Sequence, residues 1–208
     1  LLGLQNINGN YGLMGIKSFT PIFYPVSSLF LYQNPKNLKE EKLIKEISSL
    51  SENNYLAACS MIHEQLKGKP EYKSQIKLND LTIAMQKEWS NRLPKSTTRS
   101  YSKIAYVINH RKIFNEATYQ ILSRVLESMM ENPLNQRWIS HAGMKGGSTM
   151  FVLTKCLYAT LKNGNQTELS YFFNNLTEGE NKKLQGWMND FEIAVLSDQD
   201  FQKKLSQL

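Results

Sequence analysis

The stretch from His141 to Thr149, His-Ala-Gly-Met-Lys-Gly-Gly-Ser-Thr, holds the densest set of residues that could do chemistry. Lys145 offers a positive charge, Ser148 and Thr149 offer hydroxyl groups, and the glycines let a ligand approach the backbone closely. Together these groups indicate a strand edge that binds a carboxylate. The structural alternative is a glycine bulge or tight turn with a solvent-facing lysine, and spacing alone favours that alternative.

Other kinds of site fit the sequence less well. The stretch is not a P-loop, because Lys145 precedes its glycines and a strand is expected to follow them. No Gly-x-Ser-x-Gly elbow occurs, which disfavours an α/β-hydrolase. His63, His110 and His141 lack the spacing of a metal site, so neither a metal nor another cofactor is predicted. His141 is expected to be structural, with a role near substrate as the alternative.

The residues before this stretch follow the pattern of helices. In each predicted helix, apolar residues recur at helical spacing, mostly after a capping residue. Helices are expected after Asn34-Pro35, from Ser51 to Gly68, from Asn79 to Trp89, from Thr97 or Thr98, and from Asn115 to Asn132-Pro133.

The residues around and after the stretch follow the pattern of strands, with a helix at the end. Asn163-Gly164 is a hairpin signal, and the last helix should bury Leu184, Trp187, Met188 and Phe191. Strands are expected over 137–143, 149–160 and 167–174, a helix over 180–195, and a short helix capped by Ser197 with Asp200. The order predicts an α+β fold in one domain, 1–208, with a mainly helical part, 1–133, and a sheet with a closing helix, 134–208.

The net charge of the chain limits the kinds of ligand that it is expected to bind. The chain has 208 residues, 41% hydrophobic residues and a net charge of +7, which permits nucleic-acid binding but also suits anionic ligands such as carboxylates. Because the basic residues are scattered, no nucleic-acid partner is predicted; nucleic-acid binding is a weaker reading.

The cysteines, the apolar stretches and the start of the sequence bear on where the protein is located. Cys59 and Cys156 are expected to be buried free thiols, with a single disulfide as the alternative. No transmembrane span is predicted, because the most apolar stretch, Thr20 to Tyr32, is short and holds two prolines. The chain begins at Leu1 without an initiator methionine or signal peptide, so a processed or truncated part of a longer protein is expected.

Lys145-Gly146-Gly147-Ser148 resembles the Lys-Thr/Ser-Gly motif of serine β-lactamases and penicillin-binding proteins. The surroundings are similar too. Residues 138–160 resemble the inner strand pair of that family, 167–176 its next strand and 180–201 its closing helix. The resemblance is clearest over the C-terminal two-thirds of the chain. It implies a helical subdomain beside an antiparallel sheet, with the N-terminal segment of the family missing.

The resemblance also implies roles for residues. Lys145 would hold the substrate carboxylate and tune proton transfer, and the Ser148 N–H would form half of an oxyanion hole. The Ser148 or Thr149 hydroxyl would bind the same carboxylate, and Gly147 would let substrate lie along the strand. The implied protein is a periplasmic or secreted serine hydrolase, acting by acyl transfer on β-lactam or peptidoglycan-like substrates. Its partner is a small-molecule or peptide carboxylate; the oligomeric state is left open.

The chain departs from the family in ways that bear on catalysis. Gly146 stands where most members have Thr or Ser. The family's Ser-x-x-Lys occurs at Ser74–Lys77 and Ser100–Lys103, but both lie in the wrong order and too near Lys145, so neither is assigned. No Ser-Asp-Asn occurs. The alternative is therefore a non-catalytic binding or structural domain with the same fold.

Overall fold

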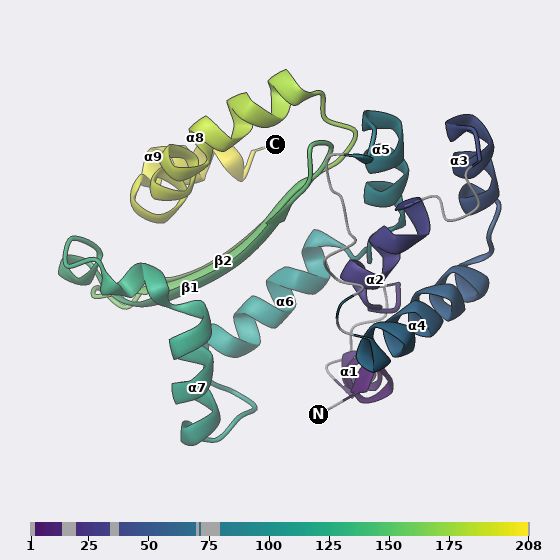
Figure 1. The fold of residues 1–208 in the computed structure, drawn as a ribbon. Helices are drawn as coiled ribbons and strands as arrows, with labels where there is room; N and C mark the ends of the chain where they lie inside the picture. The colour runs from purple at the N-terminus through teal and green to yellow at the C-terminus, as the bar shows by residue number, and fades with distance from the viewer. Residues whose placement is uncertain (1–2, 14–19, 34–37, 70, 72–79, 208) are drawn as a thin grey trace. The chain divides into compact units, whose positions relative to one another are not determined.

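A computed structural model describes residues 3–13, 20–33, 38–69, 71 and 80–207. It divides into two compact units, Leu1–Ser96 (unit 1) and Thr97–Leu208 (unit 2), and each is described by itself (Figure 1). Helices precede one antiparallel sheet, as the order of sequence patterns predicts, so the α+β class is confirmed. The expected grouping of the whole chain into one domain stays a prediction.

Unit 1 is helical over its described residues. Its core holds apolar residues from every helix after the first, including the buried Leu43, Tyr55 and Met85, together with Phe23 from a loop. The elements are α1 (Gly3–Leu13), α2 (Pro25–Leu29), a 3-10 turn η1 (Phe30–Gln33), α3 (Glu40–Ser48), α4 (Glu52–Gly68) and α5 (Ile83–Arg92).

The start of α4 follows local capping chemistry, whereas α3 begins without a side-chain cap. Ser51 caps α4 as predicted, since its side chain accepts a hydrogen bond from the N–H of Asn54. The helix predicted after Asn34-Pro35 is shorter than expected: Lys39 is still extended and α3 begins at Glu40, while Asn34 and Pro35 lie outside the described residues. The helix predicted from Asn79, also outside them, begins at Ile83.

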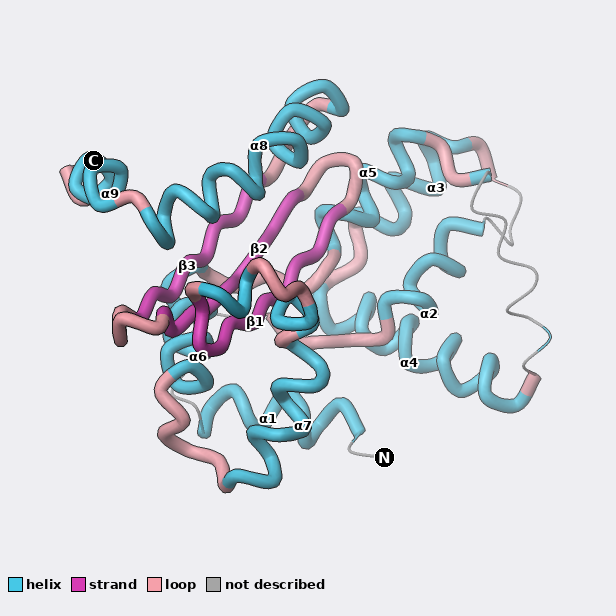
Figure 2. The backbone as a smooth tube through the Cα atoms, turned by 90° about the vertical axis from the view of Figure 1, so that its left-hand side faces the viewer, coloured by secondary structure: helices cyan, strands magenta, loops and turns pink. Residues whose placement is uncertain are grey.

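Unit 2 joins helices to a three-stranded sheet. Its elements are α6 (Thr98–Asn109), α7 (Glu116–Leu126), 3-10 turns η4 (Ser128–Glu131) and η5 (Asn135–Arg137), strands β1 (Ile139–Ser148), β2 (Leu153–Leu161) and β3 (Gln166–Phe173), and helices α8 (Glu178–Ser197) and α9 (Gln199–Leu205). The strands are antiparallel in the order β1-β2-β3, so β2 is central (Figure 2).

The extent of β1 corrects the predicted strand boundary. A strand was expected to end at Gly143 and another to begin at Thr149, with Lys145 at the junction. Instead β1 continues to Ser148, where it pairs with Leu153, so Lys145-Gly146-Gly147-Ser148 forms its C-terminal half. Glycines lower the strand propensity of this half. The pairing with β2 overrides that propensity.

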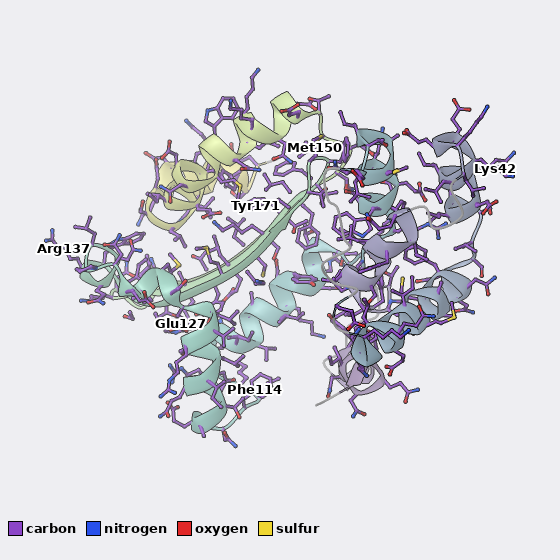
Figure 3. All side chains as sticks on the ribbon, in the orientation of Figure 1. Lys42, Phe114, Glu127, Arg137, Met150 and Tyr171 are labelled. Atoms are coloured by element: carbon purple, nitrogen blue, oxygen red, sulfur yellow. The ribbon has the colours of Figure 1, made fainter. Side chains whose placement is uncertain are left out.

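Helices cover both faces of the sheet (Figure 1). Because side chains alternate along strands, Cys156, Tyr158 and Glu168 share the face toward α6, where the Cys156 thiol lies 3.5 Å from the Tyr101 carbonyl oxygen. The opposite face packs against α8. Figure 3 shows Tyr171 between the sheet and this helix, where its hydroxyl donates to Glu192.

Several predicted details in unit 2 are corrected. Trp187 is 64% exposed, so it does not lie on the buried face of α8. The helix predicted to reach Asn132-Pro133 ends at Leu126, where α7 gives way to 3-10 structure. The short last helix is capped by the side chain of Asp198, because the Ser197 hydroxyl donates back to the carbonyl of Ile193.

The predicted caps of the two helices at the start of unit 2 are confirmed. Thr97 and Asn115 cap α6 and α7 through their side chains. Both cysteines are free thiols, Cys59 buried and Cys156 half-buried. Among the helices of the described residues, none is both long and apolar enough to cross a membrane.

Candidate functional site

Lys145 lies in the C-terminal half of β1, on the sheet face toward α6. It pairs directly with Cys156 of β2, whose thiol faces α6, and paired residues of antiparallel strands point to the same face. Lys145 and the three residues after it are exposed. The lysine therefore lies on a strand, not on a turn, with its ammonium open to solvent.

The strand that carries Lys145 has a free edge over the described residues, because β2 pairs with β1 on one side and no described strand pairs on the other. The Thr149 N–H donates to the Val152 carbonyl at 2.9 Å, toward β2. Backbone groups alternate in direction along a strand, so the Ser148 N–H points to the free edge. This backbone donor and the Lys145 side chain thus belong to the same exposed half-strand, three residues apart.

No side chains project from the strand at Gly146 and Gly147. A Cβ at Gly146 would lie 3.2 Å from the Thr154 carbonyl oxygen, while a Cβ at Gly147 would lie 3.5 Å from the Thr154 hydroxyl. That hydroxyl donates to the Gly147 carbonyl at 3.1 Å, which ties the strand end to β2. With no side chains at these two positions, an extended ligand has access to the backbone.

The turn after Ser148 is anchored from α8. The Asn181 amide donates to the carbonyls of Thr149 and Met150 at 2.8 and 3.0 Å, and Asn181 is buried. The Thr149 hydroxyl oxygen accepts from the N–H of Phe151 at 3.2 Å. Thr149 therefore helps to hold the turn, a structural use of the hydroxyl that the sequence assigns to substrate.

A polar cluster supports β1 before Lys145. The Tyr158 hydroxyl donates to the Glu127 carboxylate at 3.0 Å, and His141 Nδ1 lies 3.6 Å from the same carboxylate. The Tyr158 ring passes over Gly143, where a Cβ would lie 2.4 Å from the hydroxyl oxygen. Figure 3 shows Glu127 beside the strands, at the end of α7. The glycine is required here for close approach of a side chain and not for a turn.

The electrostatics of this cluster favour an ionised carboxylate. Burial by itself raises the pKa of Glu127, but the neighbouring His141 ring and the Tyr158 hydroxyl hold that pKa below its ordinary value. Burial and the adjacent carboxylate raise the pKa of Tyr158, which stays a neutral donor. His141 thus has a structural contact, as the sequence predicts.

The Ser-x-x-Lys pair that the structure describes belongs to a helix cap. Ser100 is in the first turn of α6, where its N–H donates to the Thr97 hydroxyl oxygen at 3.1 Å and the two hydroxyls lie 3.0 Å apart. Ser100 therefore has a structural role at the start of α6. Ser74 and Lys77 lie outside the described residues.

The structure brings some candidate residues together and separates others. Lys145, Gly147 and Ser148 share one exposed half-strand, and Thr149 follows directly in the anchored turn. Sequence reasoning missed Glu127 and Asn181, because their contacts join residues 14 to 32 positions apart and leave no local signal.

The described residues around Lys145 include no cluster of metal-binding side chains. Among the described residues, no group of three or more His, Cys, Asp or Glu side chains is placed to hold a metal ion. A cavity in unit 1 is lined by residues between Thr20 and Lys95, not by the half-strand of β1.

Comparison with known proteins does not assign the chain to a family. No family model, no curated protein and no solved structure matches it.

Proposed function

We propose that this chain belongs to a serine hydrolase of the β-lactamase or penicillin-binding type, which acts by acyl transfer on β-lactam or peptidoglycan-like substrates. The observation that carries the proposal is the position of Lys145-Gly146-Gly147-Ser148 in the exposed half of an edge strand. The antiparallel sheet with a C-terminal helix against one face also fits the β-lactamase-like fold that the motif implies.

The proposed chemistry follows from the groups on this edge. The Lys145 ammonium holds the carboxylate of the substrate through a charge-assisted hydrogen bond. The Ser148 N–H donates to the oxygen on which negative charge develops during acyl transfer. Gly147 leaves room for the substrate to lie antiparallel to β1. No cofactor is needed for these steps, and a periplasmic or secreted location would suit such substrates.

No residue is assigned as the nucleophile. The family's reaction needs a serine activated by a nearby lysine, and Ser100 takes part in the cap of α6 instead. The nucleophile is therefore proposed to be a residue other than Lys145, Gly147, Ser148 or Thr149.

A second candidate function is a non-catalytic binding or structural domain with the same fold. Gly146 favours it, because the hydroxyl that most members of the family have at this position is missing. In this case Lys145 would still hold a carboxylate, but no acyl-enzyme would form.

The two candidates differ in whether a covalent bond forms. The protein is incubated with a fluorescent penicillin; covalent labelling is read on a denaturing gel and reversible binding by fluorescence anisotropy. Lys145→Ala is expected to lower the labelling rate or the affinity roughly tenfold or more, as expected for loss of a charge-assisted hydrogen bond. Lys162→Ala, which removes an exposed lysine in the turn after β2, is the matched control.

Labelling that depends on Lys145 supports the hydrolase. Reversible binding that depends on Lys145, without labelling, supports the binding domain and contradicts the hydrolase. Absence of both from folded protein contradicts both candidates.

A further inference from the structure

A cavity of about 230 Å³ lies within unit 1 and is lined by residues that the proposed function does not use. It is bounded by the segment after Thr20, the first turns of α4 and the residues at the end of α5. Phe23, Leu56 and Leu93 give it apolar walls, while Glu52 and Lys95 also line it. A space below the roughly 300–1,000 Å³ of pockets for drug-sized ligands suits a smaller molecule.

The wall formed by Arg92 is rigid. Its guanidinium donates to the carbonyls of Leu50, Ile47 and Ser48 near the end of α3, at 3.0, 2.9 and 2.5 Å, and to Glu88 at 3.2 Å. It therefore has little capacity left for a ligand and serves to fix the wall.

The aromatic floor is fixed in the same way. The Arg92 guanidinium lies 5.1 Å from the centre of the Tyr55 ring, and Phe23 meets that ring edge-on at 5.6 Å between centroids. Phe23 and Tyr55 are both buried in the core of unit 1. A floor held by the core needs little rearrangement when a ligand binds, which lowers the cost of binding.

Two hydrogen bonds between Thr20 and Lys95 hold one side of the cavity in place. The Thr20 N–H donates to the Lys95 carbonyl at 2.8 Å, and the Lys95 N–H donates to the Thr20 hydroxyl at 2.6 Å. Two reciprocal bonds fix the position of the Lys95 backbone. Its side chain stays exposed.

Two opposite charges line this space beside its apolar residues. Glu52 and Lys95 are exposed, and within the part of the chain that the structure describes neither side chain forms an ion pair or hydrogen bond. Glu52 also lies in the first turn of α4, where an acidic residue stabilises a helix. That role accounts for Glu52 but leaves Lys95 and the apolar walls unexplained.

We propose that this cavity binds a free α-amino acid with an apolar side chain, of the size of leucine or phenylalanine. The ligand side chain packs against Phe23 and Leu56, its ammonium group bonds to the Glu52 carboxylate, and its carboxylate bonds to the Lys95 ammonium. An amino acid carries an ammonium group, a carboxylate and an apolar side chain, and the cavity offers an acid, a lysine and apolar residues to match them.

The test is calorimetric titration of the whole protein with L-leucine and L-phenylalanine, each compared with its N-acetyl derivative and its amide. The free amino acid is expected to bind with a Kd below about 1 mM. Removing either ligand charge is expected to weaken binding roughly tenfold, as are Lys95→Ala and Glu52→Gln.

The matched controls make the same two substitutions, lysine to alanine and glutamate to glutamine, at positions outside the cavity lining. Lys87→Ala removes an exposed lysine of α5, and Glu41→Gln removes an acid from the first turn of α3; neither should change the affinity. Thermal unfolding checks that each variant folds. Failure of both amino acids to bind, or equal binding by the derivatives and the Lys95 and Glu52 variants, would overturn the proposal.

Discussion

Gly143 shows most clearly how one residue supports the proposed site. Its missing side chain leaves space for the Tyr158 ring, and the Tyr158 hydroxyl bonds to Glu127 at 3.0 Å. The ring has little freedom to move away, because it is buried and its hydroxyl is held. The chain from Gly143 to Lys145 therefore rests on a contact that any Cβ would disturb.

Gly143→Ala is expected to destabilise the protein by about 1–3 kcal/mol, the usual cost of overpacking. The physical reason is the 2.4 Å approach between the added Cβ and the Tyr158 hydroxyl oxygen. Chemical denaturation measures the effect. Gly147→Ala, where the added Cβ would meet the Thr154 hydroxyl at 3.5 Å, is the matched control and should be tolerated. Equal stability of the two variants would contradict the role of Gly143.

The Glu127 carboxylate predicts a pH dependence. Its pKa in the folded protein is below the ordinary value of 4.5, so its ionised form stabilises the fold above pH 4.5 and this contribution is lost as the pH falls through the folded pKa. Glu127→Gln should cost roughly 1–3 kcal/mol at pH 7, since it weakens a buried hydrogen bond. The difference from the unsubstituted protein should shrink below pH 4.5.

Thermal unfolding between pH 7 and pH 3 measures this difference. Glu131→Gln, an exposed acid four residues away, is the control and should follow the unsubstituted protein throughout. A Glu127→Gln difference that stays constant with pH would show that the carboxylate charge does not stabilise the fold.

At the scale of elements, local chemistry predicts three helix starts but not the end of β1. Ser51, Thr97 and Asn115 cap their helices as predicted, because a capping side chain bonds to an N–H only a few residues away. β1 extends beyond its predicted end, because Gly146 and Gly147 have low strand propensity while the pairing with β2 involves residues five or more positions away.

The sequence predicts the exposed residues of the candidate site but not the side chains that support them. Lys145, Gly147 and Ser148 were found because their types suggest chemistry, and they do share one exposed half-strand. The supports from α7 and α8 depend on tertiary packing. No periodicity in the sequence indicates that Glu127 and Asn181 reach β1 and the turn after it.

Asn181 provides a prediction at the element scale. Asn181→Ala leaves the carbonyls of Thr149 and Met150 without their amide donor, so the protein should lose about 1–3 kcal/mol of stability. Amide hydrogen exchange in the turn should also become faster. Asn189→Ala, at an exposed position on the same helix, is the control. Unchanged exchange in the turn of Asn181→Ala would show that α8 does not anchor it.

At the scale of the whole molecule, the chain divides between a helical unit and a unit that contains the sheet. Each has its own cluster of buried apolar residues, one in residues 23–85 and one in residues 139–196. An independent core is the property expected of a part that folds alone.

A fragment of residues 97–208 should therefore fold without unit 1. Circular dichroism should show mixed helix and strand, and thermal unfolding should be cooperative, as for a small single domain. A fragment that stays unfolded under conditions where the whole chain is folded would contradict the division and favour the single domain predicted from the sequence.

The central claim is that the edge of β1 around Lys145 binds a carboxylate. The most direct measurement is a ¹H–¹⁵N NMR titration of the whole protein with benzylpenicillin. The Gly147 and Ser148 amide signals are expected to shift saturably, and these shifts should be lost in Lys145→Ala and kept in Lys162→Ala. Unchanged Gly147 and Ser148 signals in folded protein at saturating ligand would contradict it.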